Sequence, residues 1–177
     1  TTLKISKILK NNFKKKYKID NKIPLIGNVS RYDPQKDHLN LLKALSIIKE
    51  KKINFFCILV GTNVDSKNID LVYEIKRLKL NGNVKLLGQT NDISMVMNSL
   101  DLHVLSSSYG EGFPNVVAEA MACGTPCVVT EVGDSSLIVG KTGWIVPPKN
   151  PVRLSKAIEN ALNERDTPKW KNRSNVN

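Results

Sequence analysis

The sequence lacks the features of a membrane-spanning protein and of a disulfide-stapled scaffold. It has no run of the roughly 20 apolar residues that a membrane-spanning helix needs. Its first residues carry lysines without the apolar stretch of a signal peptide, so we expect no export. Cysteine is scarce: Cys57, Cys123 and Cys127 form no C-x-x-C pair. This predicts buried thiols in a reducing compartment, and neither disulfides nor a zinc site.

Acidic residues are also in deficit, and the deficit is uneven along the chain. The 177 residues include 27 Lys and Arg against 16 Asp and Glu, a formal net charge of +11. Residues 1–22 hold eight lysines and one aspartate, and residues 163–177 hold four bases and two acids, so the middle is nearly neutral. A nucleic-acid-binding domain would spread its bases over a folded face. We therefore expect no nucleic-acid partner.

The basic segment 1–22 allows two interpretations. The simpler one is a solvated, lysine-rich linker between domains. In the other, Ile5, Ile8, Leu9 and Phe13 form the apolar stripe of a basic amphipathic helix. Such a helix would lie on an anionic membrane or pack on a partner domain.

From residue 23 onward, short apolar runs alternate with amphipathic segments. The apolar runs favour strands buried on both faces, and the segments between them have the apolar spacing of helices. Parallel strands need such helical crossovers. Residues 23–163 are therefore predicted to form an α/β fold, a Rossmann-like doubly wound parallel sheet in three α/β/α layers, followed by a basic tail, 164–177. We predict strands over 23–29, 55–60, 84–87, 100–105, 126–130 and 144–146, and helices over 36–51, 70–80, 92–98, 114–122 and from 151 onward.

The loop after the fourth strand has the residues of an anion site. Ligands of doubly wound sheets bind outside the carboxyl ends of the strands. Gly110 and Gly112 allow close backbone approach, and Pro114 suits the first turn of the next helix. The free N–H groups and positive dipole end of that helix would face the crevice.

Two carboxylates near this helix suggest what the anion is attached to. Glu111 precedes the helix, and Glu119 falls near its second turn. Carboxylates suit sugar hydroxyls better than bare phosphate, so together with the anion site they favour a nucleotide sugar. Alternatively, Glu111 merely complements the helix dipole and Glu119 is a solvated helix residue.

Two cations follow the first strand and complete this interpretation. Arg31 and Lys36 could reach the same phosphates from the other side of the crevice and neutralise a diphosphate. Such a pair can replace a divalent metal, and the chain has no Asp-x-Asp pair to hold one. We therefore expect no metal and no cofactor.

Taken together, these residues resemble the retaining family 4 glycosyltransferases, whose two-domain architecture is called GT-B. The similarity covers their C-terminal, donor-binding domain and is strongest toward bacterial capsular and exopolysaccharide enzymes. It is carried by Arg31-x4-Lys36, Val60-Gly61-Thr62-Asn63, Asp101 to Ser108, the run 111–124 that begins Glu111-Gly112-Phe113-Pro114-Asn115, the run 125–130, Val132-Gly133-Asp134 and Val146-Pro147-Pro148.

The resemblance implies transfer of a sugar from a nucleotide diphosphate-sugar, with retention, and UDP is the expected nucleotide. Arg31, Lys36 and Glu111 would be the catalytic residues: the cations at the diphosphate, the carboxylate at the donor sugar. Glu119 would accept the ribose hydroxyls. The expected binding residues are Gly61, Leu87, Gly112, Phe113, Pro114, Asn115, Val116 and Glu119.

Two positions depart from the expected pattern, and a histidine nearby needs an interpretation. Asp37 stands where the family usually has glycine, so its charge either weakens the phosphate site or points away. Asn63 also replaces a glycine, but asparagine tolerates a left-handed turn. His103 sits in a strand pattern, which favours a core histidine over a catalytic one.

A complete enzyme of this family also has an N-terminal acceptor domain, and residues 1–22 cannot form one. We therefore expect half of a GT-B enzyme that binds donor with modest affinity and transfers little alone. Its expected location is cytoplasmic, with contact at the inner membrane face through the basic segment. The competing hypotheses are a nucleotide-sugar epimerase of the same architecture and a basic membrane or nucleic-acid adaptor.

Overall fold

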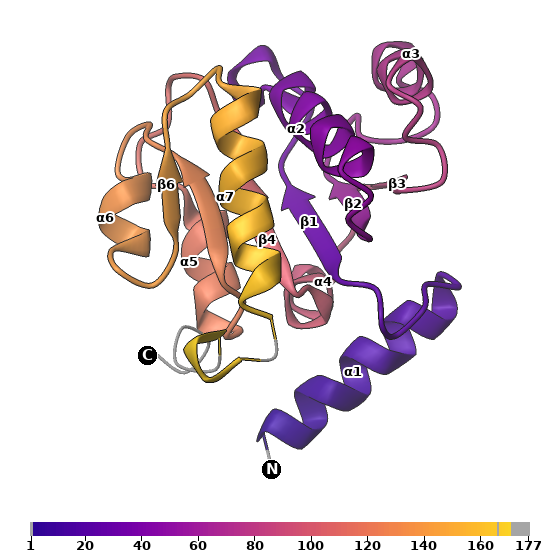
Figure 1. Ribbon diagram of the computed structural model, residues 1–177, viewed down its shortest axis with the longest axis vertical. Helices are drawn as coiled ribbons and strands as arrows, with labels where there is room; N and C mark the ends of the chain where they lie inside the picture. Colours follow the sequence, from indigo (N-terminus) through magenta and orange to yellow (C-terminus); the bar gives the residue numbers. More distant parts are fainter. Residues whose placement is uncertain (1, 166, 171–177) are drawn as a thin grey trace.

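A parallel β-sheet forms the centre of the protein. The structure, a computed structural model, describes residues 2–165 and 167–170, with side chains from residue 7 onward. In this part of the chain six strands pair in the order β3-β2-β1-β4-β5-β6, all parallel (Figure 1). The strands are β1 (Leu25–Val29), β2 (Phe56–Val60), β3 (Val84–Gly88), β4 (Leu102–Leu105), β5 (Cys127–Thr130) and β6 (Trp144–Val146).

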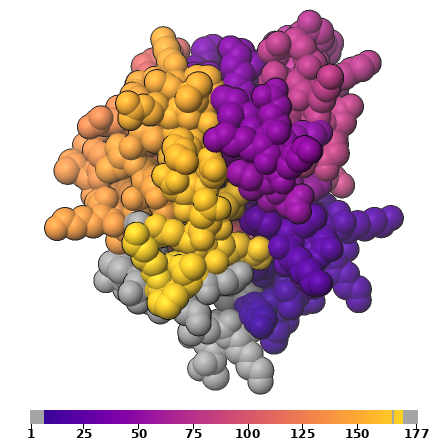
Figure 2. Space-filling view, in the orientation of Figure 1, coloured from indigo at the N-terminus to yellow at the C-terminus, as the bar shows by residue number. Residues whose placement is uncertain are grey.

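Helices cover both faces of the sheet and divide the core in two. One cluster of buried side chains joins the sheet to α2, α3 and α7, and the other joins it to α1, α4, α5 and α6. Figure 2 shows α2 and α7 closely packed over the first face. The predicted Rossmann-like α/β/α fold is confirmed. The helices are α1 (Thr2–Lys16), the 3-10 turn η1 (Pro34–Lys36), α2 (His38–Glu50), α3 (Ile69–Arg77), α4 (Ile93–Ser99), α5 (Asn115–Ala122), α6 (Ser135–Val139) and α7 (Pro151–Asn163).

Two features of the helices differ from the predictions. The helix expected from residue 36 begins at His38, because Asp37 has a left-handed φ of 47° and separates it from η1. The helix α6 was not expected, since five residues are too few to show a helical apolar period. No helix in the described part of the chain is both long and apolar enough to cross a membrane.

The interpretation of residues 1–22 as a solvated linker is wrong for part of the segment. Phe13, Lys14 and Ile19 are buried, and α1 packs against α4 of the same domain. The alternative of an amphipathic helix is correct in form: Leu9 is half-buried, although Ile8 stays 51% exposed. The side chain of Ile5 lies outside the described residues. A role of α1 as the connection to another domain stays a prediction.

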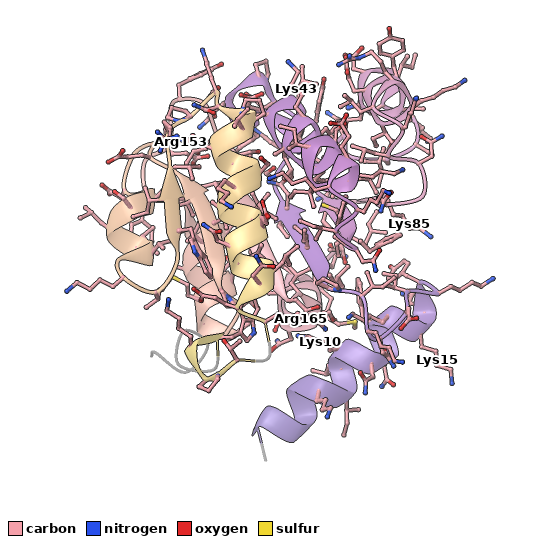
Figure 3. All side chains as sticks on the ribbon, viewed as in Figure 1. Lys10, Lys15, Lys43, Lys85, Arg153 and Arg165 are labelled. Carbon is pink, nitrogen blue, oxygen red and sulfur yellow. The ribbon has the colours of Figure 1, made fainter. Side chains whose placement is uncertain are left out.

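A buried aspartate explains why α1 is held so closely. Asp101 stands before β4, at the amino edge of the sheet, and its carboxylate receives Lys10 Nζ at 2.8 Å, Lys14 Nζ at 3.4 Å and the Leu25 N–H at 2.8 Å. Arg165 Nε lies 3.6 Å from Asp101 Oδ1, and Figure 3 shows Arg165 close to Lys10. Burial alone would raise the pKa of Asp101, but the three cations together hold the pKa below its ordinary value.

The predicted basic tail, 164–177, is anchored to the domain where the structure describes it. Arg165 joins the Asp101 cluster and donates to the Lys22 carbonyl at 3.0 Å. Trp170 packs against the core cluster shared with α2 and α7. Residues 171–177 of the predicted tail lie outside the described residues.

Candidate functional site

The strand order reverses between β1 and β4, and the two loops with the predicted site residues leave the sheet there. From β1 the order runs outward to β2 and β3, and from β4 it runs the other way to β5 and β6. The loops after β1 and β4 therefore lead to helices on opposite faces of the sheet, α2 and α5 (Figure 1). In doubly wound sheets this reversal places the ligand crevice at the carboxyl edge, between the two loops. This is the usual ligand position in a doubly wound sheet.

The structure brings Lys36 and Glu111 together across this crevice. Lys36 Nζ lies 2.5 Å from Glu111 Oε1, and both side chains are largely buried, at 12% and 6% exposure. Ser107 donates its hydroxyl to the same Oε1 at 2.5 Å. The cation expected at phosphate and the carboxylate expected at sugar thus neutralise one another in this structure.

Further hydrogen bonds tie the two loops into one unit. Gln35 donates from Nε2 to the Gly110 carbonyl at 2.7 Å and accepts from the Ser108 N–H at its own carbonyl at 2.8 Å. Ser106 donates its hydroxyl to the Lys36 carbonyl at 2.9 Å. These bonds fix where the Lys36 side chain starts, so its reach toward Glu111 is set by the backbone.

Arg31 lies on the same loop as Lys36 but is not engaged in the crevice. Its side chain is 57% exposed, with Nη2 donating to Gln35 Oε1 at 3.2 Å and Nε 3.6 Å from Asp33 Oδ2. Exposed pairs of this kind are weak. The guanidinium can therefore exchange these partners for an anionic ligand at little cost.

The N-terminus of α5 is open to a ligand. Pro114 is the N-cap, one residue before the first helical turn where it was expected, and no side chain caps the helix. Gly112, Phe113 and Asn115 are exposed, while Val116 packs on the core cluster behind the helix. The first amide groups of α5 thus remain available to an anion.

The other predicted binding residues have different positions. Glu119 is exposed on α5, one turn beyond Asn115, and its carboxylate makes no hydrogen bond or ion pair with the described residues. Gly61 packs directly against the backbone before Arg31, because a Cβ at its φ of 153° would overlap the Ser30 carbonyl. Leu87 lies within β3, at the sheet edge two strands from β1, and its side chain packs on the second core cluster. The roles of these residues in binding stay predictions.

The two residues that depart from the family pattern, and the two histidines, have structural explanations. The Asp37 carboxylate caps α2 by accepting the Asn40 N–H at 3.2 Å, and Asn63 has the left-handed φ of 59° expected of a glycine substitute. His103 is a buried core residue, as predicted, and its Nε2 accepts the Val29 N–H at 3.3 Å. Burial lowers its pKa to about 4. His38, beneath the Lys36 loop, has a pKa lowered to about 4 by burial and by the Lys36 charge.

Three residues that shape the crevice were not predicted as site residues: Gln35, Ser107 and Gly133. The last two entered the sequence analysis only as members of the matching runs. The serine run at 106–108, directly before the glycine-rich loop, was a usable signal for Ser107. Gly133 has a left-handed φ of 56°, and a Cβ there would overlap the carbonyl oxygens of Glu111 and Gly112. Nothing within the loop itself indicates this contact, because it comes from the loop after β5.

Gly133→Ala is therefore expected to lower the free energy of unfolding by about 2 kcal/mol or more, from the left-handed φ and the overlap with Glu111. Gly112→Ala is the matched control, because a Cβ there meets nothing within 4 Å. It should stay within about 0.5 kcal/mol of wild type in urea-induced unfolding. Equal stability of the two variants would contradict the proposed packing of Gly133 on the loop.

The two loops and α5 together offer a lysine, an exposed arginine and a helix N-terminus for an anion. They also carry two carboxylates, Glu111 and Glu119, that could accept hydrogen bonds from hydroxyl groups. Among the described residues, no three His, Cys, Asp or Glu side chains gather as metal ligands would. The chemistry that suits this crevice is recognition of a phosphate joined to a polyhydroxylated group.

Solved structures of known proteins resemble this domain closely. Anabaena HepE, crystallised in complex with UDP-glucose, matches with a TM-score of 0.83 and 27% identity over 94% of this chain and 45% of its own. A glycosyltransferase from Rickettsia africae ESF-5 matches with a TM-score of 0.83 and 25% identity, over 93% of this chain and 44% of its own.

The sequence also matches enzymes of polysaccharide synthesis. CapM, a capsular polysaccharide biosynthesis glycosyltransferase of Staphylococcus aureus, is 29% identical over 157 residues, which are 87% of this chain and 41% of CapM. The chain spans less than half the length of these relatives. The model of the family described as glycosyl transferases group 1 matches residues 10–175. The chain therefore belongs to the group 1 glycosyl transferases.

Proposed function

We propose that this chain is the donor-binding domain of a retaining, hexosyltransferase-type enzyme of family 4 that uses a UDP-sugar. The acceptor would be a saccharide or lipid-linked saccharide of a surface polysaccharide. The observation that carries the proposal is the Lys36–Glu111 pair, which joins the loops after β1 and β4 where the strand order reverses. Glu111 is four residues before Asn115, the uncapped start of α5. The UDP-glucose complex of HepE and the polysaccharide role of CapM support the choice of donor and product.

In this proposal the diphosphate draws Lys36 away from Glu111. Arg31 leaves Gln35 and Asp33 and closes on the same phosphates, and the amide groups at the start of α5 face them from the other side. As the bond between sugar and phosphate breaks, negative charge grows on the nucleotide diphosphate. Two cations and a helix N-terminus stabilise that charge, so these groups need no metal ion beside them.

Recognition of the sugar follows from the same displacement. Once Lys36 has moved, the Glu111 carboxylate is largely buried with only Ser107 as a partner, and a donor-sugar hydroxyl restores its second hydrogen bond. Glu119, which is already free and exposed, accepts the ribose hydroxyls. Main-chain groups of Gly112 and Phe113 lie beside the sugar.

Calorimetric titration with UDP and UDP-glucose tests this assignment. Lys36→Met should weaken UDP binding about tenfold or more, the loss expected for a charge-assisted hydrogen bond. Glu111→Gln should act in the opposite direction on UDP, because it frees Lys36, while lowering the extra affinity that glucose adds. Arg31→Ala and Glu119→Ala should each weaken UDP, and Lys76→Met, an exposed lysine on α3, serves as the control.

Three outcomes would oppose the proposal: equal UDP affinity in the Lys36→Met and Lys76→Met variants, heat from UDP only when magnesium is added, or stronger binding of GDP or ADP. The last two would overturn the metal-free site and the choice of base. The titrations are therefore run in chelator and then in magnesium. The cytoplasmic location, the membrane contact of the basic segment and the partner acceptor domain are further parts of the proposal.

A further inference from the structure

A small cavity lies outside the crevice, between the start of α2 and the start of α7. Its volume is about 120 Å³, and both helices begin at the carboxyl edge of the sheet. Figure 3 labels Lys43 on α2 and Arg153 in the first turn of α7, and both lie toward this edge of the sheet. Nucleotide and drug-like ligands occupy cavities of roughly 300 Å³ or more, so this one suits only a small ion or a single functional group. It is lined by Asp37, Leu39, Asn40, Lys43, Lys149 and Pro151.

An unsatisfied amide lies against this cavity. Asn40 is only 4% exposed, and neither its Oδ1 nor its Nδ2 has a hydrogen-bond partner among the described residues. Leaving such a group unpaired costs roughly 1–3 kcal/mol. Leucine at this helix position would avoid that cost and join the leucines of α2 in the core. Asn40 thus places a buried, unpaired amide next to a cavity that two lysines also line.

The charges around the cavity select an anion. Lys43 and Lys149 both line it, and neither has an ion-pair partner in the part of the chain described. Asp37 is the one carboxylate of the lining, and its Oδ1 is already used to cap α2 at the Asn40 N–H. Two helix N-termini add their positive dipole ends. The net charge around the cavity is therefore positive.

We propose that this cavity binds a phosphate group, free or as a phosphomonoester, at a site separate from the donor crevice. Asn40 Nδ2 donates to one phosphate oxygen, and the ammonium groups of Lys43 and Lys149 contact the others. The Lys36 side chain, on the neighbouring turn, instead reaches across the crevice to Glu111. The proposal does not rest on donor binding, which the UDP titration tests by itself.

Inorganic phosphate is the first probe, and the side-chain amide NMR signals of Asn40 give a readout at the site itself. Phosphate should shift both signals in wild type and in Lys36→Met, whether or not UDP is present. The Lys43→Gln/Lys149→Asn double variant should raise the Kd for phosphate about tenfold or more. Asparagine is chosen because it tolerates the left-handed φ of 53° at residue 149. Lys76→Gln is the control.

Asn40→Leu separates a binding role from a structural one. It should raise the melting temperature without phosphate, because it removes an unpaired buried amide, and abolish the further rise that phosphate gives the wild type. Vesicles of phosphatidylcholine with and without phosphatidic acid distinguish a lipid phosphate from a free one. The proposal is overturned if neither probe shifts the Asn40 signals, if the shift survives the double lysine variant, or if Asn40→Leu lowers the melting temperature.

Discussion

Acidification from about pH 7 to about pH 4 is expected to lower the free energy of unfolding by roughly 3 kcal/mol for each of two buried histidines. Burial lowers the pKa of His38 and of His103 to about 4, from an ordinary value of 6.5. Between these values the unfolded chain binds protons that the folded chain excludes. Stability is therefore intact above pH 6.5, falls as the pH drops toward 4, and stops falling from this cause below 4.

Urea-induced unfolding at several pH values across this range measures how the free energy of unfolding depends on pH. His103→Gln and His38→Gln should each remove about half of the loss, because glutamine can keep a hydrogen bond to Val29 N–H or to the Ser30 hydroxyl without titrating. Each variant is compared with wild type at about pH 7 first, so that a packing defect is separated from the pH slope. An unchanged slope in the double variant would show that other groups cause the acid sensitivity.

Asp101→Asn is expected to lower the free energy of unfolding by about 3–5 kcal/mol, the usual cost of removing one partner of a buried ion pair. The substitution leaves Lys14, whose side chain is 1% exposed, without its counter-charge. The Lys14 ammonium still donates a hydrogen bond to the Ile23 carbonyl at 2.6 Å. Burial already lowers the pKa of Lys14, and Asp101 opposes that effect. Losing Asp101 should also loosen α1, which limited proteolysis within residues 2–16 would detect.

A second substitution shows whether the cost comes from the stranded charge. Lys14→Met in the Asp101→Asn background should recover much of the lost stability, because a buried cation is replaced by an apolar side chain of similar shape. Asp134→Asn serves as the control, since Asp134 is exposed and caps α6 with no side-chain hydrogen bond. A loss below about 1 kcal/mol for Asp101→Asn would contradict the described cluster.

The fold was predictable because its strands are short apolar runs and most of its helices have clear apolar spacing. The errors lie where spacing carries no information. The turn η1 and the left-handed Asp37 depend on local capping, and α6 is too short for a period. Lysines in a row suggested a solvated segment, but Lys14 is buried because Asp101, far away in the sequence, meets it at the amino edge of the sheet.

The proximity of Lys36 and Glu111 was predictable, but the details of their contact were not. Parallel strand order alone places the loops of Lys36 and Glu111 at one edge, so their proximity followed from topology. Their direct ion pair did not, since it depends on the hydrogen bonds that Gln35 and Ser106 make between the loops. The packing of Gly133 under Glu111 is a contact between distant segments, and one sequence does not reveal it.

The Lys36–Glu111 pair balances a positive and a negative charge between the two loops, and under the proposed function this would couple the two halves of a donor thermodynamically. In that proposal a diphosphate that takes Lys36 strands the Glu111 carboxylate, so a nucleotide without sugar meets resistance that a hydroxyl of the sugar removes. Each half of the ligand would thereby strengthen the binding of the other. Once the sugar had left, that support would end, Lys36 would return to Glu111, and the spent nucleotide would bind the domain more weakly.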